Sequence, residues 1–399
     1  MGTLAVKYMG SKRAMLRNGL GDLLVKEACG ARRFVDLFCG SGVVSWYVSK
    51  NIKIPVLAVD LQKYSAVLAR AVLERTEPVN FDRFWPQWQQ RSEAWLIEGF
   101  ARELKKARML RNQFKKRMLR RHIIEARKSC SPIKNAPVTS AYGGHYYSPL
   151  QALQIDALRA TLPRNKPGRD IALASLLEAA SQCAAAPGHT AQPFGNTPTA
   201  REWIKKAWGR EVLAFTKRAF HDFAAIHATE RGEARLGDAN RVARSLKESD
   251  LVFVDPPYSN VQYSRFYHVL ETITRGQPVE VSGTGRYPAI TQRPQSKYSV
   301  RSKSRKAFDG LLSTLANRKV RCILTFPVGN ASNGLSGGVV ERLARKYFLV
   351  SRKTVKSHFS TLGGNGNHRK ARLKTPELIL VMTPKSSRLS AYSKQVTRG

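Results

Sequence analysis

Short apolar runs recur along this chain, and they predict the strands of an α/β fold. The runs are rich in Val, Leu, Ile and Phe and too short for helices, which is typical of buried parallel strands. They occupy residues 34–38, 55–59, 234–236, 251–254 and 321–326, with a closing pair at 348–353 and 378–382. Helical patterns alternate with these runs toward both ends of the chain, which predicts a doubly wound mixed sheet.

Residues 81–230 follow a different pattern, with long helical stretches and concentrated positive charge. We expect one long helix over 93–128 and two further helices over 169–186 and 200–227. The portion 101–128 holds twelve Lys or Arg against two Glu. That imbalance favours a surface that contacts phosphates over a merely solvated helix face.

Two loops and a tail complete the predicted organisation. Residues 130–149 are rich in Ser, Pro, Gly and Tyr, which predicts a loop. Residues 285–306 carry seven Lys or Arg together with Tyr287 and Tyr298. This second loop is expected to contact phosphates, and its tyrosines to contact bases or sugars. Residues 385–399 are polar and basic and are expected to form a flexible tail.

The excess of positive charge indicates a polyanionic partner. Among 399 residues, 68 Lys and Arg face 28 Asp and Glu, a formal net charge of +40. Solubility does not require so one-sided an excess, so nucleic acid is favoured and a membrane surface is the weaker alternative. No apolar run approaches the roughly 18 residues of a spanning helix, and the N-terminus lacks the form of a signal peptide.

The cysteines help to define the compartment. There are five, widely scattered and without a C-x-x-C pair. This pattern indicates neither a zinc site nor a disulfide framework, and it predicts a reducing, cytoplasmic compartment.

The first candidate site lies where the strand at 34–38 enters the turn Gly40-Ser41-Gly42. Glycines allow the backbone to approach a ligand closely. The dinucleotide fingerprint is incomplete because position 45 is Ser, and the P-loop pattern is absent. The loop therefore favours a nucleoside-type cofactor without a pyrophosphate. Asp60 ends the next strand, where an acid can accept hydrogen bonds from ribose hydroxyls; a helix N-cap is the structural alternative.

The second candidate site is Asp255-Pro256-Pro257-Tyr258, directly after the buried run 251–254. Two prolines fix the backbone and remove two N–H donors. The result is an acceptor-rich wall with an aromatic face, which suits an amino group on a flat ring such as a nucleobase. An ordinary turn after a strand is the structural alternative.

Taken together, these motifs resemble those of S-adenosylmethionine-dependent methyltransferases, and more narrowly the D12 class of N6-adenine DNA methyltransferases. The resemblance is carried, in the family's order, by Lys7 to Arg13, Asp36 to Gly42, Asp60, Gly237-Asp238-Ala239 and Asp255 to Tyr258. Tyr263 to Glu271 also resemble the helix that follows in one branch of the class. The resemblance implies a methyltransferase fold with a helical, basic inserted region. It also implies S-adenosyl-L-methionine as cofactor, no metal, and double-stranded DNA as partner.

The resemblance also assigns roles to individual residues. Asp255 and the Pro256 carbonyl would accept hydrogen bonds from the adenine N6 amino group, with Pro257 and Tyr258 completing the catalytic motif. Tyr258 would stack on an adenine flipped out of the duplex. The implied cofactor-binding residues are Tyr8, Lys12, Asp36, Phe38, Gly40, Gly42, Asp60 and Asp238.

We therefore predict a site-specific DNA methyltransferase whose catalytic domain spans residues 1–80 and 231–384. Residues 81–230 would form the target-recognition region, and the enzyme would act as a monomer on DNA. A cognate restriction endonuclease is a further partner that the resemblance suggests. Three alternatives stay open: N4-cytosine methylation, adenine methylation in RNA, and a catalytically silent nucleic-acid-binding protein. Asp rather than Ser at position 255 favours adenine by resemblance.

Overall fold

The computed structural model describes residues 6, 11–116, 118–360 and 372–385. The chain forms two compact units. The sheet unit consists of residues 10–61, 229–263 and 295–399. The helical unit consists of residues 1–9, 62–228 and 264–294.

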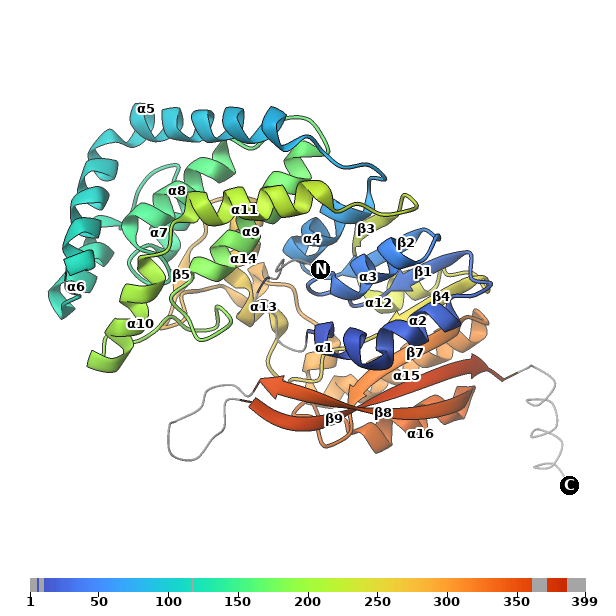
Figure 1. Cartoon of the computed structure of the whole chain (residues 1–399). Coiled ribbons are helices and arrows are strands. Elements are labelled where there is room, and N and C mark those ends of the chain that lie inside the picture. The colour runs from blue at the N-terminus through green and yellow to red at the C-terminus, as the bar shows by residue number, and fades with distance from the viewer. Residues whose placement is uncertain (1–5, 7–10, 117, 361–371, 386–399) are drawn as a thin grey trace, which may run out of the picture. The chain divides into compact units, whose positions relative to one another are not determined.

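The sheet unit is built on seven strands in the order β3-β2-β1-β4-β7-β9-β8 (Figure 1). Their bounds are β1 Arg33–Asp36, β2 Val56–Asp60, β3 Glu233–Leu236, β4 Asp250–Val254, β7 Arg321–Pro327, β8 Phe348–Ser360 and β9 Arg372–Pro384. Strand β9 is antiparallel to both of its neighbours, β7 and β8. The other neighbouring pairs, β3–β2, β2–β1, β1–β4 and β4–β7, are parallel. The predicted mixed sheet is confirmed, and β8 and β9 are longer than their apolar runs indicated.

Helices cover both faces of this sheet (Figure 1). On one face, α12 (Ala239–Ala243), α15 (Arg301–Asn317) and α16 (Gly337–Tyr347) share a core with alternate strand residues such as Val35, Val252 and Leu324. Each such buried side chain contributes about 1.5–3 kcal/mol. On the other face lie α2 (Gly21–Glu27), which follows α1 (Arg13–Met15) and η1 (Leu16–Leu20), and α3 (Val43–Asn51).

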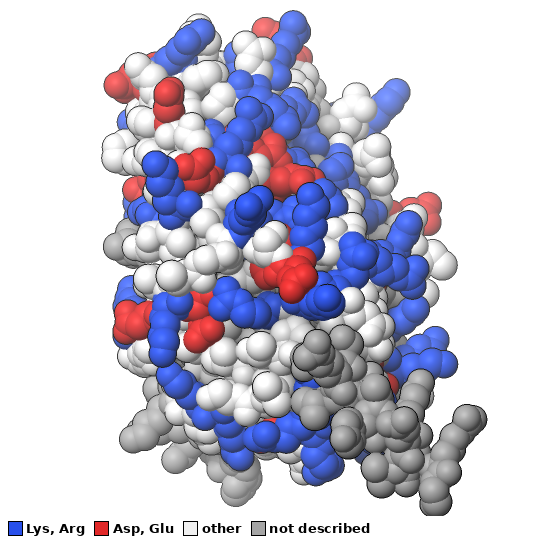
Figure 2. All heavy atoms as spheres, turned by 90° about the vertical axis from the view of Figure 1, so that its right-hand side faces the viewer, with Lys and Arg blue, Asp and Glu red and all other residues white. Residues whose placement is uncertain are grey.

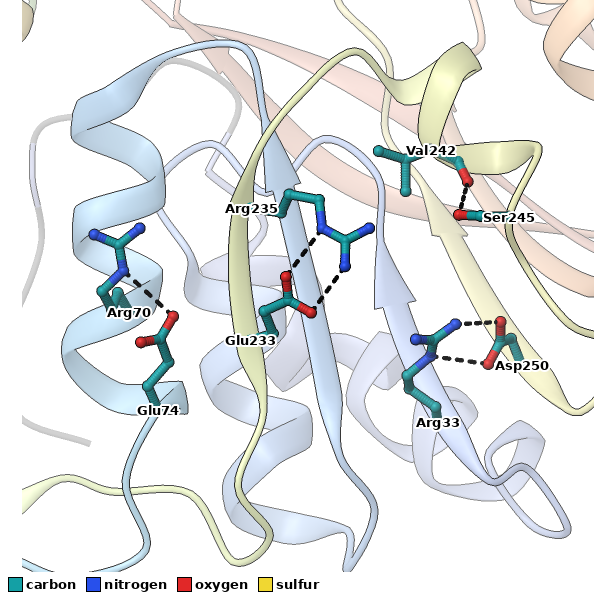
Figure 3. Close-up of polar contacts among 8 residues, drawn as sticks. All are labelled: Arg33, Arg70, Glu74, Glu233, Arg235, Val242, Ser245 and Asp250. Atoms are coloured by element: carbon teal, nitrogen blue, oxygen red, sulfur yellow. Dashed lines mark hydrogen bonds and ion pairs between the residues drawn. The ribbon is translucent and has the colours of Figure 1, made fainter.

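A bidentate ion pair joins the starts of β1 and β4 (Figure 3). Arg33 Nε and Nη2 donate to the two carboxylate oxygens of Asp250 at 3.0 and 2.7 Å. The same two residues are partners in the strand register, which continues to Asp36 opposite Phe253. The pair therefore supports the register that brings the other ends of β1 and β4 together.

The helical unit contains most of the remaining helices. They are α4 Lys63–Leu73, α5 Phe81–Lys116, α6 Arg120–Ser129, α7 Pro137–Tyr142, α8 Pro149–Ala160, α9 Gly168–Cys183, α10 Pro198–Trp208, α11 Val212–Ala225 and α14 His268–Arg275. A small hairpin of β5 (Val281–Ser282) and β6 (Tyr287–Pro288) follows, then η2 (Ile290–Gln292). Helix α13 (Tyr263–Phe266) spans the change from one unit to the other.

The structure corrects two of the predicted helices. The single helix over 93–128 is wrong, because α5 already begins at Phe81 and α6 begins only after Leu119, whose backbone is extended (φ −107°, ψ 160°). The segment 200–227 forms two helices, α10 and α11, rather than one. Helix α9 confirms the prediction over 169–186.

The predicted loop at 130–149 is also wrong, since it contains α7 and the start of α8. Its tyrosines, Tyr142, Tyr146 and Tyr147, are fully buried. Each hydroxyl has a partner: Thr272 Oγ1 at 2.9 Å, the carbonyls of Thr190 and Gly285 at 2.7 and 2.9 Å, and the carbonyl of Ala180 at 3.0 Å, respectively. Satisfied hydroxyls let these rings serve as core despite the polar composition of the segment.

The second basic loop is shorter than predicted. Residues 301–306 form the beginning of α15, and Lys297–Ser299 form the short helix η3. Tyr298 is 3% exposed and its hydroxyl donates to Asn240 Oδ1 at 2.8 Å, so the expected contact with bases or sugars is wrong for this residue. Of the predicted tail, residues 385–399, only Lys385 lies within the described residues.

Candidate active site

The carboxyl ends of β1, β2, β3 and β4 meet at one edge of the sheet, because these strands are parallel. The chain moves outward from β1 through β2 to β3 and then returns to β4 on the other side of β1. Ligands bind at such a switch in strand order in open α/β sheets. The glycine loop follows β1 and the Asp255 motif follows β4, so both predicted motifs flank the switch.

The glycine loop is shaped by its backbone. Gly40 and Gly42 have φ of 51° and 80°, in the left-handed region that favours glycine. Asp60 Oδ2 accepts a hydrogen bond from the Gly40 amide at 2.9 Å, which ties the loop to the end of β2. A Cβ added to Gly42 would lie 3.0 Å from the Trp46 ring, so that ring would have to shift to admit a side chain.

Asp36 supports this loop from within the core. The side chain is fully buried and accepts hydrogen bonds from Ser45 Oγ at 2.7 Å and from the Phe38 amide at 3.4 Å. Burial raises the pKa of Asp36 to about 7, although both hydrogen bonds lower it. The contact with Ser45 joins the end of β1 to the first turn of α3.

Asp255 lies at the centre of a buried ionic cluster. Lys12 Nζ lies 3.0 Å from Asp255 Oδ1 and 3.2 Å from Glu377 Oε2. The Thr325 hydroxyl donates to the same Oδ1 at 2.8 Å. Lys12 and Glu377 are each only 3% exposed, whereas the Asp255 side chain is 17% exposed. The contacts with Lys12 and Thr325 are thus both made through Oδ1 of Asp255.

The charges in this cluster oppose the effect of burial. Burial tends to lower the pKa of Lys12, but the carboxylates of Asp255 and Glu377 raise it above its ordinary value, so Lys12 stays charged. Burial raises the pKa of Asp255, Lys12 lowers it, and Glu377 raises it again. With both acids ionised, the cluster carries one positive and two negative charges.

The residues after Asp255 are held by the loop that follows β7. Asn333, fully buried, donates through Nδ2 to the carbonyls of Pro257 at 2.9 Å and Tyr298 at 3.0 Å. The Tyr258 ring is 6% exposed and lies edge-on to Tyr263, with ring centroids 6.4 Å apart. These contacts fix the backbone of the proline motif.

The structure brings most of the predicted site residues into the sheet unit. Phe38 is half-buried and lies edge-on to Tyr298, at 5.1 Å between ring centroids. Asp238 accepts a hydrogen bond from the Arg241 amide at 3.1 Å and caps α12. Tyr8 lies outside the described residues. The binding roles of these residues stay predictions.

Sequence reasoning missed three residues of this site: Thr325, Glu377 and Asn333. Glu377 had a usable signal, because it is an acid directly before the apolar run 378–382. Thr325 lies inside a strand, and Asn333 lies in a loop of ordinary composition, so neither stands out in the sequence.

Membrane-spanning helices and metal-binding clusters are both absent from the part of the chain that the structure describes. None of its helices is both long and apolar enough to span a bilayer. Within the same residues, no group of three or more His, Cys, Asp or Glu side chains is arranged to hold a metal ion.

Comparison with known proteins identifies the family. The model of the D12 class N6 adenine-specific DNA methyltransferases matches residues 8–321. The chain belongs to this D12 family. The strand order, the glycine loop at the end of β1 and the Asp255 motif at the end of β4 agree with this membership.

Three curated relatives of this D12 protein are named as methylases. The LlaI modification methylase of Lactococcus lactis subsp. lactis is 27% identical over 317 residues, which cover 77% of this chain and 44% of the relative. The type II methyltransferase M.FokI of Planomicrobium okeanokoites is 26% identical over 312 residues, 77% of this chain and 42% of the relative. The type II methyltransferase M.NlaIII of Neisseria lactamica is 25% identical over 318 residues, which cover 77% of this chain and 79% of the relative. The chain thus spans less than half the length of the first two.

Proposed function

We propose that this chain transfers a methyl group from S-adenosyl-L-methionine to N6 of an adenine in DNA. The observation that carries the proposal is the arrangement of Asp255. Its Oδ1 is held by Lys12 and Thr325 at 3.0 and 2.8 Å, at the switch in strand order and beside the glycine loop. That arrangement makes Oδ2 available as an acceptor for an amino group.

The residues at the strand ends fit S-adenosylmethionine. Gly40 and Gly42 have no side chains at two positions of the turn, so a ligand can lie closely against its backbone. Asp60 and Asp238, at the ends of β2 and β3, are acceptors suited to ribose hydroxyls and to the adenine amino group of the cofactor. Phe38, just after the end of β1, adds an apolar surface. The bound cofactor would supply an electrophilic methyl group on a sulfonium centre.

Asp255 would act on the nucleophile. The lone pair of adenine N6 is delocalised into the ring, so the amine is a poor nucleophile until its hydrogens are held. Asp255 Oδ2 and the Pro256 carbonyl would each accept one N6–H, which directs the lone pair toward the methyl carbon. The methyl group would pass to N6 as its bond to the sulfonium breaks with both electrons left on sulfur, and N6 would then lose one proton to water. A negative carboxylate in a partly dry site stabilises the positive charge that develops on N6.

The target base must leave the duplex to reach this site, at a cost of a few kcal/mol. Stacking on Tyr258, once its ring turns away from Tyr263, would offset part of that cost. Phosphate contacts would offset more, since the chain has a formal net charge of +40 and cations are spread over the face seen in Figure 2. We assign most of these contacts to residues 81–230, where exposed cations line α5 and α6.

The names of the relatives favour a role in restriction and modification, with a cognate endonuclease as the partner activity. Methylome sequencing of a host that expresses the chain would identify both the base and its sequence context. Protection of the same context from cleavage would support the partnership.

Transfer of labelled methyl to unmethylated double-stranded DNA, followed by nucleoside analysis, tests the activity. Label on N6-methyladenine in the wild type and its loss in Asp255→Asn would support the proposal. Label on cytosine, label on RNA alone, or full activity in Asp255→Asn would each contradict it.

A further inference from the structure

Glu377 holds a position that the transfer reaction alone does not explain. It lies at the start of the buried part of β9, opposite Pro327 of β7, and is 3% exposed. Its Oε2 lies 3.2 Å from the same Lys12 ammonium that binds Asp255. A buried acid is costly unless it is paired, and one ammonium here serves two carboxylates.

We propose that Glu377 is a positioning residue that sets the charge of the catalytic cluster, so that Asp255 remains a strong hydrogen-bond acceptor while Lys12 holds it. This inference rests on the proposed methyl transfer, and it assigns a role to a residue outside the Asp255 motif.

Without Glu377, Lys12 and an ionised Asp255 would form a pair with no net charge. An ammonium 3.0 Å from Oδ1 neutralises the carboxylate and weakens its attraction for a developing cation. With Glu377 present, Lys12 is shared between two acids, and the three side chains keep a net negative charge. That charge would face N6 as it becomes positive, which is the moment when electrostatic stabilisation accelerates the reaction.

The geometry also gives Glu377 a mechanical part. Lys12 precedes α1, Asp255 follows β4, Thr325 belongs to β7 and Glu377 to β9, so the cluster joins four separate segments. Lys12 contacts both carboxylates, at 3.0 Å from Asp255 Oδ1 and 3.2 Å from Glu377 Oε2, which restricts where the ammonium can lie. Lys12 and Thr325 then both approach Oδ1, and Oδ2 keeps its orientation.

The pH dependence follows from the groups around Asp255. Burial raises the pKa of Asp255, Lys12 and Thr325 lower it, and Glu377 raises it. Asp36 of β1 and Tyr263 of α13 also interact electrostatically with this carboxylate. In Glu377→Gln the raising charge is lost, so the pKa of Asp255 falls and the carboxylate stays ionised to lower pH.

The test compares Glu377→Gln, Glu377→Asp and wild type by the pH profile of kcat/KM and by kcat and KM at pH 8. We expect kcat of Glu377→Gln to fall roughly 10²-fold, as when one oriented electrostatic group is lost, with KM for DNA nearly unchanged. The acid limb of its profile should move to lower pH. Glu377→Asp retains the charge and should recover much of kcat.

Asp250→Asn is the matched control, because Asp250 is a buried acid paired with Arg33 at the other end of β4. It should lower stability and leave the acid limb in place. An acid limb in Glu377→Gln that coincides with that of wild type would overturn the inference.

Carboxyl ¹³C titration of Asp255, assigned with Asp255→Asn, gives a readout that does not depend on turnover. A lower Asp255 pKa in Glu377→Gln supports the coupling, and an unchanged pKa overturns it. A wild-type chain that transfers no methyl group to DNA would instead contradict the proposed function, so the two failures are distinguishable.

Discussion

Thr325 and Asp255 are joined across adjacent strands by a hydrogen bond of 2.8 Å from Oγ1 to Oδ1. Strand β7 pairs with β4 in parallel, with Val254 opposite Leu324. Asp255 directly follows Val254, and Thr325 directly follows Leu324. The sheet register therefore fixes the distance between the hydroxyl and the carboxylate. Thr325 is fully buried, and its side chain is oriented by the strand rather than by solvent.

Replacing Thr325 by Val should weaken catalysis without disturbing the fold, because the two side chains have the same shape. Loss of one hydrogen bond to a charged group costs about 1.5–3 kcal/mol, so we expect kcat to fall at least roughly 10-fold. The Thr325 bond lowers the pKa of Asp255. Without it the pKa rises, and the acid limb of the pH profile should move to higher pH.

The direction of this shift is opposite to that expected for Glu377→Gln. Thr325→Ser keeps the hydroxyl and should retain the wild-type profile. An acid limb that stays in place in Thr325→Val would show that the hydroxyl does not act on Asp255.

The strands and their terminal acids could be predicted from the sequence because the signal is local. A short apolar run followed by a carboxylate identifies the ends of β2 and β4, and this signal can be read without knowing which strands pair with them. The pairing of Lys12 with Glu377 could not be predicted in this way. It depends on β9 lying between β7 and β8 with Pro327 opposite Glu377, which is a property of the sheet register.

The errors in the helical unit have a related cause. The residue pattern from 93 to 128 predicted one uninterrupted helix, but that pattern does not determine where a backbone breaks. The Ser, Pro, Gly and Tyr content of 130–149 predicted a loop, yet Tyr142, Tyr146 and Tyr147 are buried. Their burial depends on hydroxyl partners distant in sequence, such as Thr190 and Thr272, which composition does not reveal.

Gly42→Ala should destabilise the sheet unit. The residue has φ of 80°, and an added Cβ would lie 3.0 Å from the Trp46 ring. The left-handed backbone alone costs roughly 1–2 kcal/mol for a residue with a side chain. Chemical denaturation should show a loss of at least that size. Gly329→Ala is the control, since a Cβ there would meet nothing within 4 Å; an equal loss in both variants would contradict the argument.

Asp60→Asn should weaken cofactor binding and leave the glycine loop intact. The amide oxygen can still accept the Gly40 amide, which the carboxylate now accepts at 2.9 Å. Charge-assisted bonds to ribose hydroxyls would be lost, so we expect S-adenosylmethionine to bind roughly 10-fold more weakly. Asp60→Ala also loses the Gly40 contact and should bind more weakly still. Calorimetric titration of the cofactor measures both, and wild-type affinity in Asp60→Ala would exclude Asp60 from the cofactor site.

The cations at the start of α6 should contact DNA phosphates. Arg120 and Arg121 are exposed, and neither forms an ion pair with an acid among the described residues. Each phosphate contact releases about one counterion, so replacing both by Gln should reduce the salt dependence of DNA binding by about two in the log–log slope. Fluorescence anisotropy with a labelled duplex at several salt concentrations measures this slope.

Arg235→Gln provides the control for that experiment. Arg235 is an exposed cation already paired with Glu233 on β3, with Nη2 at 2.9 Å from Oε2 (Figure 3). Its replacement by Gln lowers the net charge of the chain by one, as each of the two α6 substitutions does. Unlike Arg120 and Arg121, however, Arg235 is already neutralised by Glu233. We expect its slope to equal that of wild type. If Arg235→Gln and the α6 variant lowered the slope in proportion to their charge alone, the effect would reflect the overall +40 charge of the chain rather than contacts made by α6.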